Sequence, residues 1–354
     1  MLRDIYVRPI GLMPAGQTAS AREATGSLPL AGGWLDFSAL QIIERNGAHV
    51  DRYVTGLGDF LERDWGRRTL QAADLFEAMR APRARMAGLA LDRPRIMGIV
   101  NVTPDSFSDG GRLGTVEAAV ARGLALGEEG ADILDVGGES TRPGSDAIGT
   151  DEEIRRVIPV IERLRAKTDL LISVDTRKPE VMRAAHQAGA DLVNDVSALM
   201  FDRASLETAA ELGLPVILMH AQGDPKTMQQ APHYGDVLLE VFDHLEARIE
   251  ACIRAGIGRE KLIVDPGLGF GKTFAHNLAL MSGLTLFHAL GVPLLLGASR
   301  KSFIGKLSGV DEPSLRMAGS VAAALHGVSQ GAQLLRVHDV EATRQAITVW
   351  SALQ

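Results

Sequence analysis

Eight short apolar segments recur along the last three quarters of the chain, and each ends in a charged, amide, imidazole or hydroxyl residue. They are Arg95–Asn101, Ala131–Asp135, Leu170–Thr176, Leu192–Ser197, Pro215–His220, Leu262–Asp265, Pro293–Ser299 and Leu334–Asp339. Their Val, Ile and Leu residues alternate little with polar ones, as expected of parallel strands that are buried on both faces. Eight such strands with helices between them have one common solution, a closed parallel barrel whose chemistry lies at the C-terminal strand ends. We therefore predict an α/β fold, a (β/α)8 TIM barrel, over residues 93–354.

A segment with helical spacing follows each predicted strand. These segments are Thr115–Glu129, Asp151–Thr168, Pro179–Ala188, Arg203–Leu212, Gly235–Ala255, Phe274–Leu290, Pro313–Gln330 and Glu341–Leu353. Residues 1–92 do not follow this rhythm, and we predict a small N-terminal α/β extension whose role the sequence does not show. Its expected elements are strands at Tyr6–Leu12 and Trp34–Ser38, a loop at Gly16–Gly26, and helices at Ala39–Asn46 and Thr69–Arg80.

Composition narrows the range of partners. The formal net charge of -7 and the isoelectric point near 5.8 argue against a nucleic-acid surface or an anionic membrane as partner. No run of 18 apolar residues occurs, and Met1–Gly16 has charged residues where a signal peptide has an apolar core, so we expect a cytoplasmic protein. Cys252 is the only cysteine, and its place in an amphipathic helix indicates a buried thiol rather than a nucleophile.

Long polar segments follow the first two strands. Asn101–Gly111 spans eleven residues, which is long for a βα connection and favours a functional loop over a capped turn. Asp135–Gly144 is a second polar, glycine-containing segment. A single acid at a strand end, such as Asp175 or Asp265, is more often a helix cap, but several together in a barrel mouth favour a site. His220 is equally consistent with a buried, hydrogen-bonded histidine and with a ligand contact.

These segments resemble those of the dihydropteroate synthase family. Asn101–Gly111 and Asp135–Gly144 resemble its two signature segments, and six further matches follow in order. They are Ser173–Thr176, Asn194–Ser197, Met219–His220, Asp265–Lys272, Ser299–Ser302 and Arg336–Asp339. The resemblance covers about residues 94–350, whereas residues 1–92 match no part of the family core. Gly267–Lys272 superficially resembles a phosphate-binding loop. It lacks the full Walker spacing, so we do not predict a nucleotide-binding site there.

The resemblance implies a reaction of the folate pathway. The enzyme would transfer a pterinylmethyl group from 6-hydroxymethyl-7,8-dihydropterin pyrophosphate to p-aminobenzoate, giving 7,8-dihydropteroate and pyrophosphate. It also implies an aminobenzoate pocket of the kind that sulfonamides occupy, a homodimer joined through barrel helices, and no nucleic-acid or membrane partner.

The resemblance also implies which residues bind the pterin. A pterin has a flat edge of amide and amino groups, so its site needs buried donors and acceptors in fixed places. Asp265 would accept from the 2-amino group and ring N–H, and Lys301 would donate to the ring carbonyl and N5. The implied pterin set is Asp135, Asp175, Asn194, Met219, Asp265, Phe270 and Lys301, with Met219 and Phe270 against the ring. Arg300 is expected to be a solvated charge.

The remaining implied roles concern the two anionic groups. Arg336 and His338 on the eighth strand, with Thr141 and Arg142, would bind the pyrophosphate. Mg²⁺ prefers oxygen donors, and Asn101 would be its protein ligand. Phe107, Pro143, Lys301 and Ser302 would form the aminobenzoate pocket. Asp135, Asp105, Phe107 and Arg142 would be the catalytic set, with pyrophosphate leaving before the amine attacks a cationic pterin methylene.

Two rival functions are open to a chain of this kind. A pterin-dependent methyltransferase domain shares the barrel and the pterin-binding acids, but it needs neither a pyrophosphate site nor the loops at Asn101–Gly111 and Thr141–Pro143. A non-catalytic relative would lack some of the site residues, and none of the motif positions is lost. The presence of the two loops and of all the motif residues therefore favours the synthase over both rivals.

Overall fold

A closed parallel barrel forms the larger part of the protein. The computed structural model describes residues 3–16, 18–102, 111–140, 147–223 and 227–354, with the backbone alone at 111–115. The barrel strands are β5 (Arg95–Asn101), β6 (Ile133–Gly137), β7 (Leu171–Asp175), β8 (Leu192–Asp195), β9 (Val216–Met219), β10 (Leu262–Asp265), β11 (Leu295–Leu296) and β12 (Leu334–Val337). They pair in parallel in the order β10-β9-β8-β7-β6-β5-β12-β11, and a parallel bridge between Val264 and Leu294 joins the two ends. The predicted (β/α)8 barrel is confirmed.

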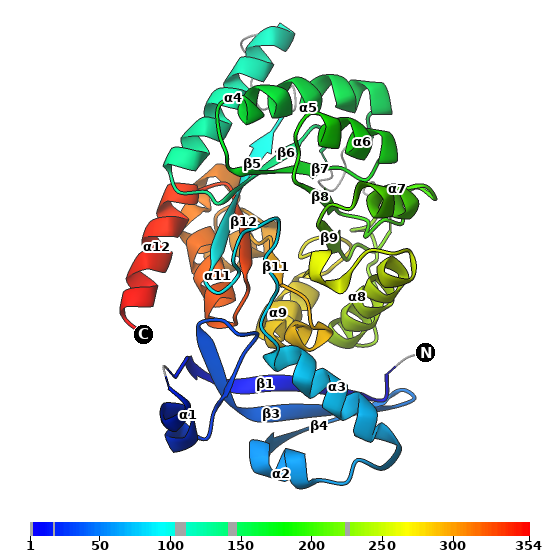
Figure 1. Ribbon diagram of the computed structural model, residues 1–354, viewed down its shortest axis with the longest axis vertical. Coiled ribbons are helices and arrows are strands. Elements are labelled where there is room, and N and C mark those ends of the chain that lie inside the picture. Colours follow the sequence, from blue (N-terminus) through cyan, green and yellow to red (C-terminus); the bar gives the residue numbers. More distant parts are fainter. Residues whose placement is uncertain (1–2, 17, 103–110, 141–146, 224–226) are drawn as a thin grey trace.

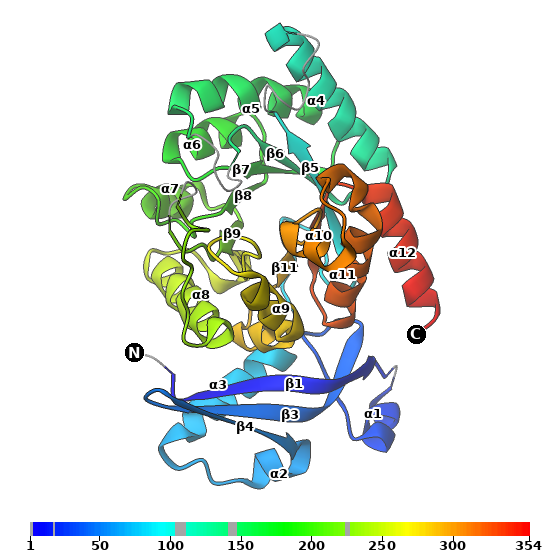
Figure 2. The same ribbon diagram turned by 180° about the vertical axis from the view of Figure 1, so that it is seen from behind.

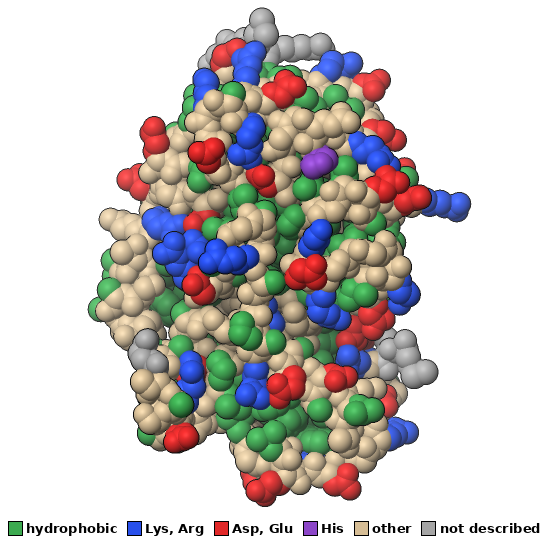
Figure 3. Space-filling model, in the orientation of Figure 1, with side chains coloured by type: hydrophobic (Ala, Val, Ile, Leu, Met, Phe, Trp, Pro, Cys, Tyr) green, Lys and Arg blue, Asp and Glu red, His purple; other side chains and the backbone are tan. Residues whose placement is uncertain are grey.

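The base of the barrel is an apolar layer to which every strand contributes one residue. Its members are Met97, Ile133, Leu171, Leu192, Ile217, Ile263, Leu295 and Leu334. Met86 and Leu91, from the segment before β5, complete this layer and are 1% and 3% exposed. That segment crosses the near end of the barrel in Figure 1. Acidic and basic side chains are interspersed over the face seen in Figure 3. Among the described residues, Arg344 Nη2 and Asp132 Oδ2 form an ion pair at 2.6 Å.

Helices surround the barrel. They are α4 (Gly111–Glu128), α5 (Thr150–Arg165), α6 (Pro179–Gln187), α7 (Ser205–Leu212), α8 (Val237–Arg254), α9 (Phe274–Ser282), α10 (Ser302–Ser308), α11 (Met317–Ser329) and α12 (Val340–Ala352). The helix predicted at Phe274–Leu290 ends at Ser282 and continues as a 3-10 helix, η4 (Leu284–Leu290). A Cβ atom at Gly283 would lie 2.5 Å from Leu238 Cδ1, so a larger residue at this break would require Leu238 of α8 to move. Helix α10 was not predicted.

The N-terminal extension is an antiparallel sheet with three helices. Its elements are β1 (Ile5–Pro14), α1 (Ala19–Thr25), β2 (Leu28–Pro29), β3 (Leu35–Asn46), β4 (His49–Gly56), α2 (Leu57–Glu62) and α3 (Thr69–Arg80). The predicted helix at Ala39–Asn46 is wrong, because these residues extend β3 between β1 and β4. Pairing on both edges and burial of Leu40, Ile42 and Ile43 outweigh their helical spacing. The predicted loop at Gly16–Gly26 contains α1, which Thr18 caps by accepting from the Ala21 N–H.

The extension packs against the side of the barrel. In Figure 2, β1 and α3 lie beside α8, α9 and η4, and all seven residues of η4 are buried. Asp243 of α8 accepts hydrogen bonds from Tyr6 Oη and Arg45 Nη2, both at 2.8 Å. Trp34 Nε1 donates to the Val328 carbonyl at 3.0 Å. Apolar residues of the extension and of the outer barrel layer form one continuous cluster.

Candidate active site

Polar side chains occupy the inner positions two residues beyond the apolar layer. Side chains two apart on a strand point to the same side, so Ile133 is followed inward by Asp135, and Ile263 by Asp265. The same spacing relates Leu192 to Asn194 and Leu334 to Arg336. The C-terminal strand ends therefore carry buried charged and amide groups above an apolar base. This end of the barrel is the candidate active site.

Arg336 is the centre of this polar layer. Its Nε donates to Asp135 Oδ2 at 2.5 Å, and its Nη2 donates to Asp175 Oδ2 at 2.7 Å. Asn194 Nδ2 also donates to Asp135 Oδ2, at 3.1 Å. Asp135 Oδ1 is buried and accepts no hydrogen bond from any described residue. The geometry thus leaves one carboxylate oxygen as an acceptor for a ligand N–H group.

Burial and charge act in opposite directions on this cluster. Burial disfavours the Arg336 cation, but the carboxylates of Asp135 and Asp175 raise its pKa, so the guanidinium stays charged. Burial raises the pKa of Asp175 to about 7, against the lowering effect of Arg336. Two acids therefore share one cation, and the charge on Asp175 changes near neutral pH.

Asp265 and Lys301 form the opposite side of the mouth. Asp265 Oδ1 accepts from the Gly267 N–H at 2.7 Å, and burial raises the pKa of this acid. Burial lowers the pKa of Lys301 to about 8, with the Asp265 carboxylate acting against that shift. Lys301 Nζ donates to the Leu268 carbonyl and lies 4.8 Å from the centre of the Phe270 ring. Met219, at the end of β9, is 4% exposed. The structure thus brings all seven predicted pterin residues to one end of the barrel.

The remaining described residues of the prediction lie around this centre. Asn101 is the last residue of β5, and its carboxamide makes no hydrogen bond to a described residue. His338 follows β12, and its Nδ1 lies 3.0 Å from Ser299 Oγ. Arg300 is not a solvated charge as expected, since it is half-buried and its Nη2 donates to Asp339 Oδ1 at 2.5 Å. The predicted residues Asp105, Phe107, Thr141, Arg142 and Pro143 lie outside the described residues.

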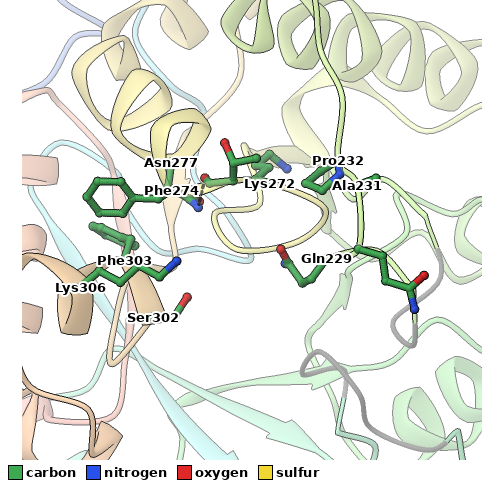
Figure 4. Close-up of a pocket in the computed structure, with 11 residues that line it drawn as sticks. Gln229, Ala231, Pro232, Lys272, Phe274, Asn277, Ser302, Phe303 and Lys306 are labelled. Atoms are coloured by element: carbon green, nitrogen blue, oxygen red, sulfur yellow. Dashed lines mark hydrogen bonds between the residues drawn. The ribbon is translucent and has the colours of Figure 1, made fainter.

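A pocket of about 450 Å³ opens beside Lys301. Ser302 and Lys306 of α10 lie on one side of it, and Gln229 and Pro232 lie on the other (Figure 4). Lys272 and Asn277 also line it. Ser302 is therefore a residue of the rim, one position after Lys301, and it faces a space with mostly polar walls.

Several buried charges near the mouth were not given a role from the sequence. Asp195 follows Asn194 and accepts from the Ser197 N–H at 2.6 Å, and burial raises its pKa to about 6. Glu139 accepts from Arg177 Nε at 3.1 Å and lies 3.2 Å from Lys178 Nζ. Asp195 and Glu139 fall inside the segments Asn194–Ser197 and Asp135–Gly144, and this position is the sequence signal from which a role at the mouth could have been predicted. Asp195 is hydrogen-bonded within its own segment, whereas the partners of Glu139 follow another strand, β7, and spacing alone does not identify them.

The residues that the structure describes at the mouth can be tested against the predicted magnesium ion. Among the described residues, no group of three or more His, Cys, Asp or Glu side chains could hold a metal. The Asn101 carboxamide at the mouth has the oxygen donor that Mg²⁺ prefers, and Mg²⁺ usually keeps several waters and substrate oxygens as its other ligands. Asn101 therefore fits the predicted ion without a protein cage.

Comparisons with known proteins agree with this geometry. A family described as pterin binding enzyme matches residues 97–338. The dihydropteroate synthase of Escherichia coli (strain K12) is 50% identical over 269 residues, which are 76% of this chain and 95% of that protein. The structure of Xanthomonas albilineans dihydropteroate synthase with 4-aminobenzoic acid superimposes with a TM-score of 0.73 at 58% identity, covering 77% of this chain and 98% of that one. The same enzyme in complex with 7,8-dihydropteroate gives a TM-score of 0.70 at 56% identity, covering 77% and 99%.

Proposed function

The chain belongs to the dihydropteroate synthase family, and from its own geometry we propose how its residues bind two substrates and join them. It is a transferase of folate biosynthesis that condenses 6-hydroxymethyl-7,8-dihydropterin pyrophosphate with p-aminobenzoate. The observation that carries the assignment of roles is the buried set of Asp135, Asp175, Asn194 and Arg336 at the strand ends.

The pterin edge binds between this set and Asp265. Asp265 accepts from the 2-amino group and the adjacent ring N–H, and Asn194 offers both a donor and an acceptor. Lys301 donates to the ring carbonyl, and its pKa near 8 leaves it mostly charged at neutral pH. Phe270 and Met219 pack against the ring. Oδ1 of Asp135, which has no hydrogen-bond partner in the described part of the chain, accepts from the pterin on the side of N5.

The pyrophosphate lies towards β12. Arg336 uses Nε and Nη2 for Asp135 and Asp175, so its Nη1 group stays available for a phosphate oxygen. His338, Thr141 and Arg142 complete the anion site. Asn101 would hold Mg²⁺, which when bound neutralises charge on the leaving group.

Bond breaking precedes amine attack in this mechanism. As pyrophosphate leaves, its electron pair goes with it, and positive charge develops on the pterin methylene. Asp135 and Asp175 lie on the same side of the site and stabilise that charge. The aromatic amine of p-aminobenzoate is neutral near pH 7, so it needs no base before it attacks. Asp105, Phe107 and Pro143 close its pocket with Lys301 and Ser302, and exclusion of water protects the cation.

A homodimer is supported by an apolar groove between α11 and α12. Met317, Val349 and Leu353 line it and are 48%, 55% and 78% exposed. An exposed patch of this kind on outer helices fits a self-complementary interface around a twofold axis. Every helix in the described part of the chain falls short of what a membrane span requires. We propose a cytoplasmic location, because the pterin pyrophosphate is a multiply charged anion that does not cross a membrane unaided.

An assay of pyrophosphate release tests the function directly. Purified protein should release pyrophosphate only when p-aminobenzoate, the pterin pyrophosphate and Mg²⁺ are all present. Release without p-aminobenzoate would indicate a hydrolase, and no release from the folded protein would refute the synthase.

A further inference from the structure

Lys272 is a buried lysine directly behind the proposed pterin site, and burial lowers its pKa well below the ordinary value. The residue is 2% exposed, and its Nζ lies 2.9 Å from His220 Nδ1, 3.2 Å from the His220 carbonyl and 3.0 Å from the Phe270 carbonyl. A lysine ammonium has three N–H donors, so these three acceptors match it completely. His220 then accepts at Nδ1 and carries its proton at Nε2. Burial, together with the Lys272 charge, lowers the pKa of His220 to about 2, which agrees with a neutral ring.

The turn between β10 and Lys272 lies directly against the end of β9. Gly267 and Gly271 have left-handed φ values of 67° and 62°. A Cβ atom at Gly267 would lie 1.8 Å from the His220 carbonyl oxygen, and one at Gly271 would lie 2.2 Å from that of Gln222. Glycine is therefore required at both positions for the two backbones to meet.

Side chains, rather than regular secondary structure, fix the shape of this turn. The Leu268 carbonyl accepts from Lys301 Nζ, and the Phe270 carbonyl accepts from Lys272 Nζ. The Gly271 carbonyl accepts from Tyr234 Oη at 2.9 Å. The direction of the Phe270 ring therefore depends on the donors that hold the peptides on both sides of it.

We propose that Lys272 and His220 form a positioning pair that holds Phe270 and Met219 at the spacing the pterin ring requires. His220 directly follows Met219, and Lys272 lies two residues after Phe270, so one hydrogen-bonded unit joins both apolar contacts. Neither residue needs to touch the substrate. The inference rests on the proposed pterin site, and it assigns His220 a role that its sequence position left open.

Binding of a free pterin tests the pair without turnover. Lys272→Met keeps most of the length of the side chain and removes all three donors. Calorimetric titration with 6-hydroxymethylpterin should show affinity reduced about tenfold, or about 1.4 kcal/mol. The KM for p-aminobenzoate should change less than the pterin affinity, because Phe270 and Met219 are proposed contacts of the pterin and not of p-aminobenzoate. Lys261→Met is the matched control: its Nζ donates to the Gly213 carbonyl at 2.8 Å, away from the mouth, and its pterin affinity should not change.

Two substitutions at His220 provide a second test that does not depend on the fold of Lys272→Met. His220→Asn keeps an acceptor near the position of Nδ1, whereas His220→Leu removes it. We expect the leucine variant to lose about tenfold in pterin affinity and the asparagine variant to stay within about threefold of the parent. The proposal is overturned if the two variants bind pterin alike, or if folded Lys272→Met binds it as tightly as the parent. Pyrophosphate release by the unsubstituted protein tests the proposed function separately.

Discussion

Ile133 and Asp135 lie two residues apart on β6, both are fully buried, and both point into the barrel. Ile133 belongs to the apolar layer to which all eight strands contribute, and Met86 and Leu91 complete that layer. Asp135 meets a guanidinium and an amide, and one of its oxygens has no partner among the described residues. The same strand thus contributes to an apolar layer at the base of the barrel, which needs no hydrogen-bond partners, and to a polar layer at the mouth, where one buried oxygen has no partner among the described residues.

This difference separates stability from function along a single strand. Burial of apolar area at the base stabilises the fold and does not depend on any polar partner. Burial of charge at the mouth is unfavourable unless every charge is paired, and here two acids share Arg336. Substitutions at the mouth should therefore change catalysis most, and substitutions at the base should change the free energy of unfolding most.

The largest expected effect is that of Arg336→Met. The change removes the guanidinium that bridges Asp135 and Asp175, and with it the proposed Nη1 contact to phosphate. We expect kcat/KM to fall roughly 10³-fold, or about 4 kcal/mol, as for loss of a transition-state donor. Steady-state kinetics with the pterin pyrophosphate varied will measure it.

Arg344→Met is the control for that change. Arg344 pairs with Asp132 and the Gly130 carbonyl at the base of the barrel. Its kcat/KM should stay within about twofold of the parent. Similar losses in both arginine variants would contradict the division between mouth and base.

The second effect concerns the base. Ile133→Ala leaves a cavity in a layer that cannot collapse easily, and we expect a loss of about 3 kcal/mol in the free energy of unfolding. Ile133→Val should cost about 1 kcal/mol. Urea unfolding will measure both, and KM for each substrate should stay near the parent value. A large rise in KM with unchanged stability would place Ile133 in the site instead.

The third effect is a change in how stability depends on pH. The pKa of Asp175 is raised to about 7 by burial, above its value of about 4 in an unfolded chain. An acid with a raised pKa in the folded state contributes stability that is complete at low pH and is lost as pH rises through that pKa. The contribution of Asp175 to the free energy of unfolding should therefore decrease between about pH 4 and pH 7, and the difference between the curves of the parent and Asp175→Asn should change with pH over that range. Parallel curves for the two proteins would show that Asp175 does not titrate in this range.

The sequence predicted the barrel well because each strand is buried on both faces and each is followed by its own helix. The ends of β5 and β10 match the prediction residue for residue. The helix predicted at Ala39–Asn46 was wrong, because pairing with two neighbouring strands, and not the local spacing of apolar residues, decides the structure there. The pterin residues were found at the strand ends through the family motifs. The Lys272–His220 contact joins residues 52 apart along the chain, so only the fold reveals it.

The smallest effect extends the comparison to the N-terminal extension. Asp243 of α8 holds Tyr6 and Arg45, and the side chains of Arg45 and Asp243 are 13% and 11% exposed. Asp243→Asn keeps one acceptor for Tyr6 but removes the charge that pairs with Arg45. We expect a loss of about 1 kcal/mol in the free energy of unfolding, with kcat and both KM values unchanged. Asp51→Asn, at an exposed pair with His49, should cost less than about 0.5 kcal/mol. If Asp243→Asn instead lowered kcat, the extension would act on the mouth as well as on the stability of the barrel.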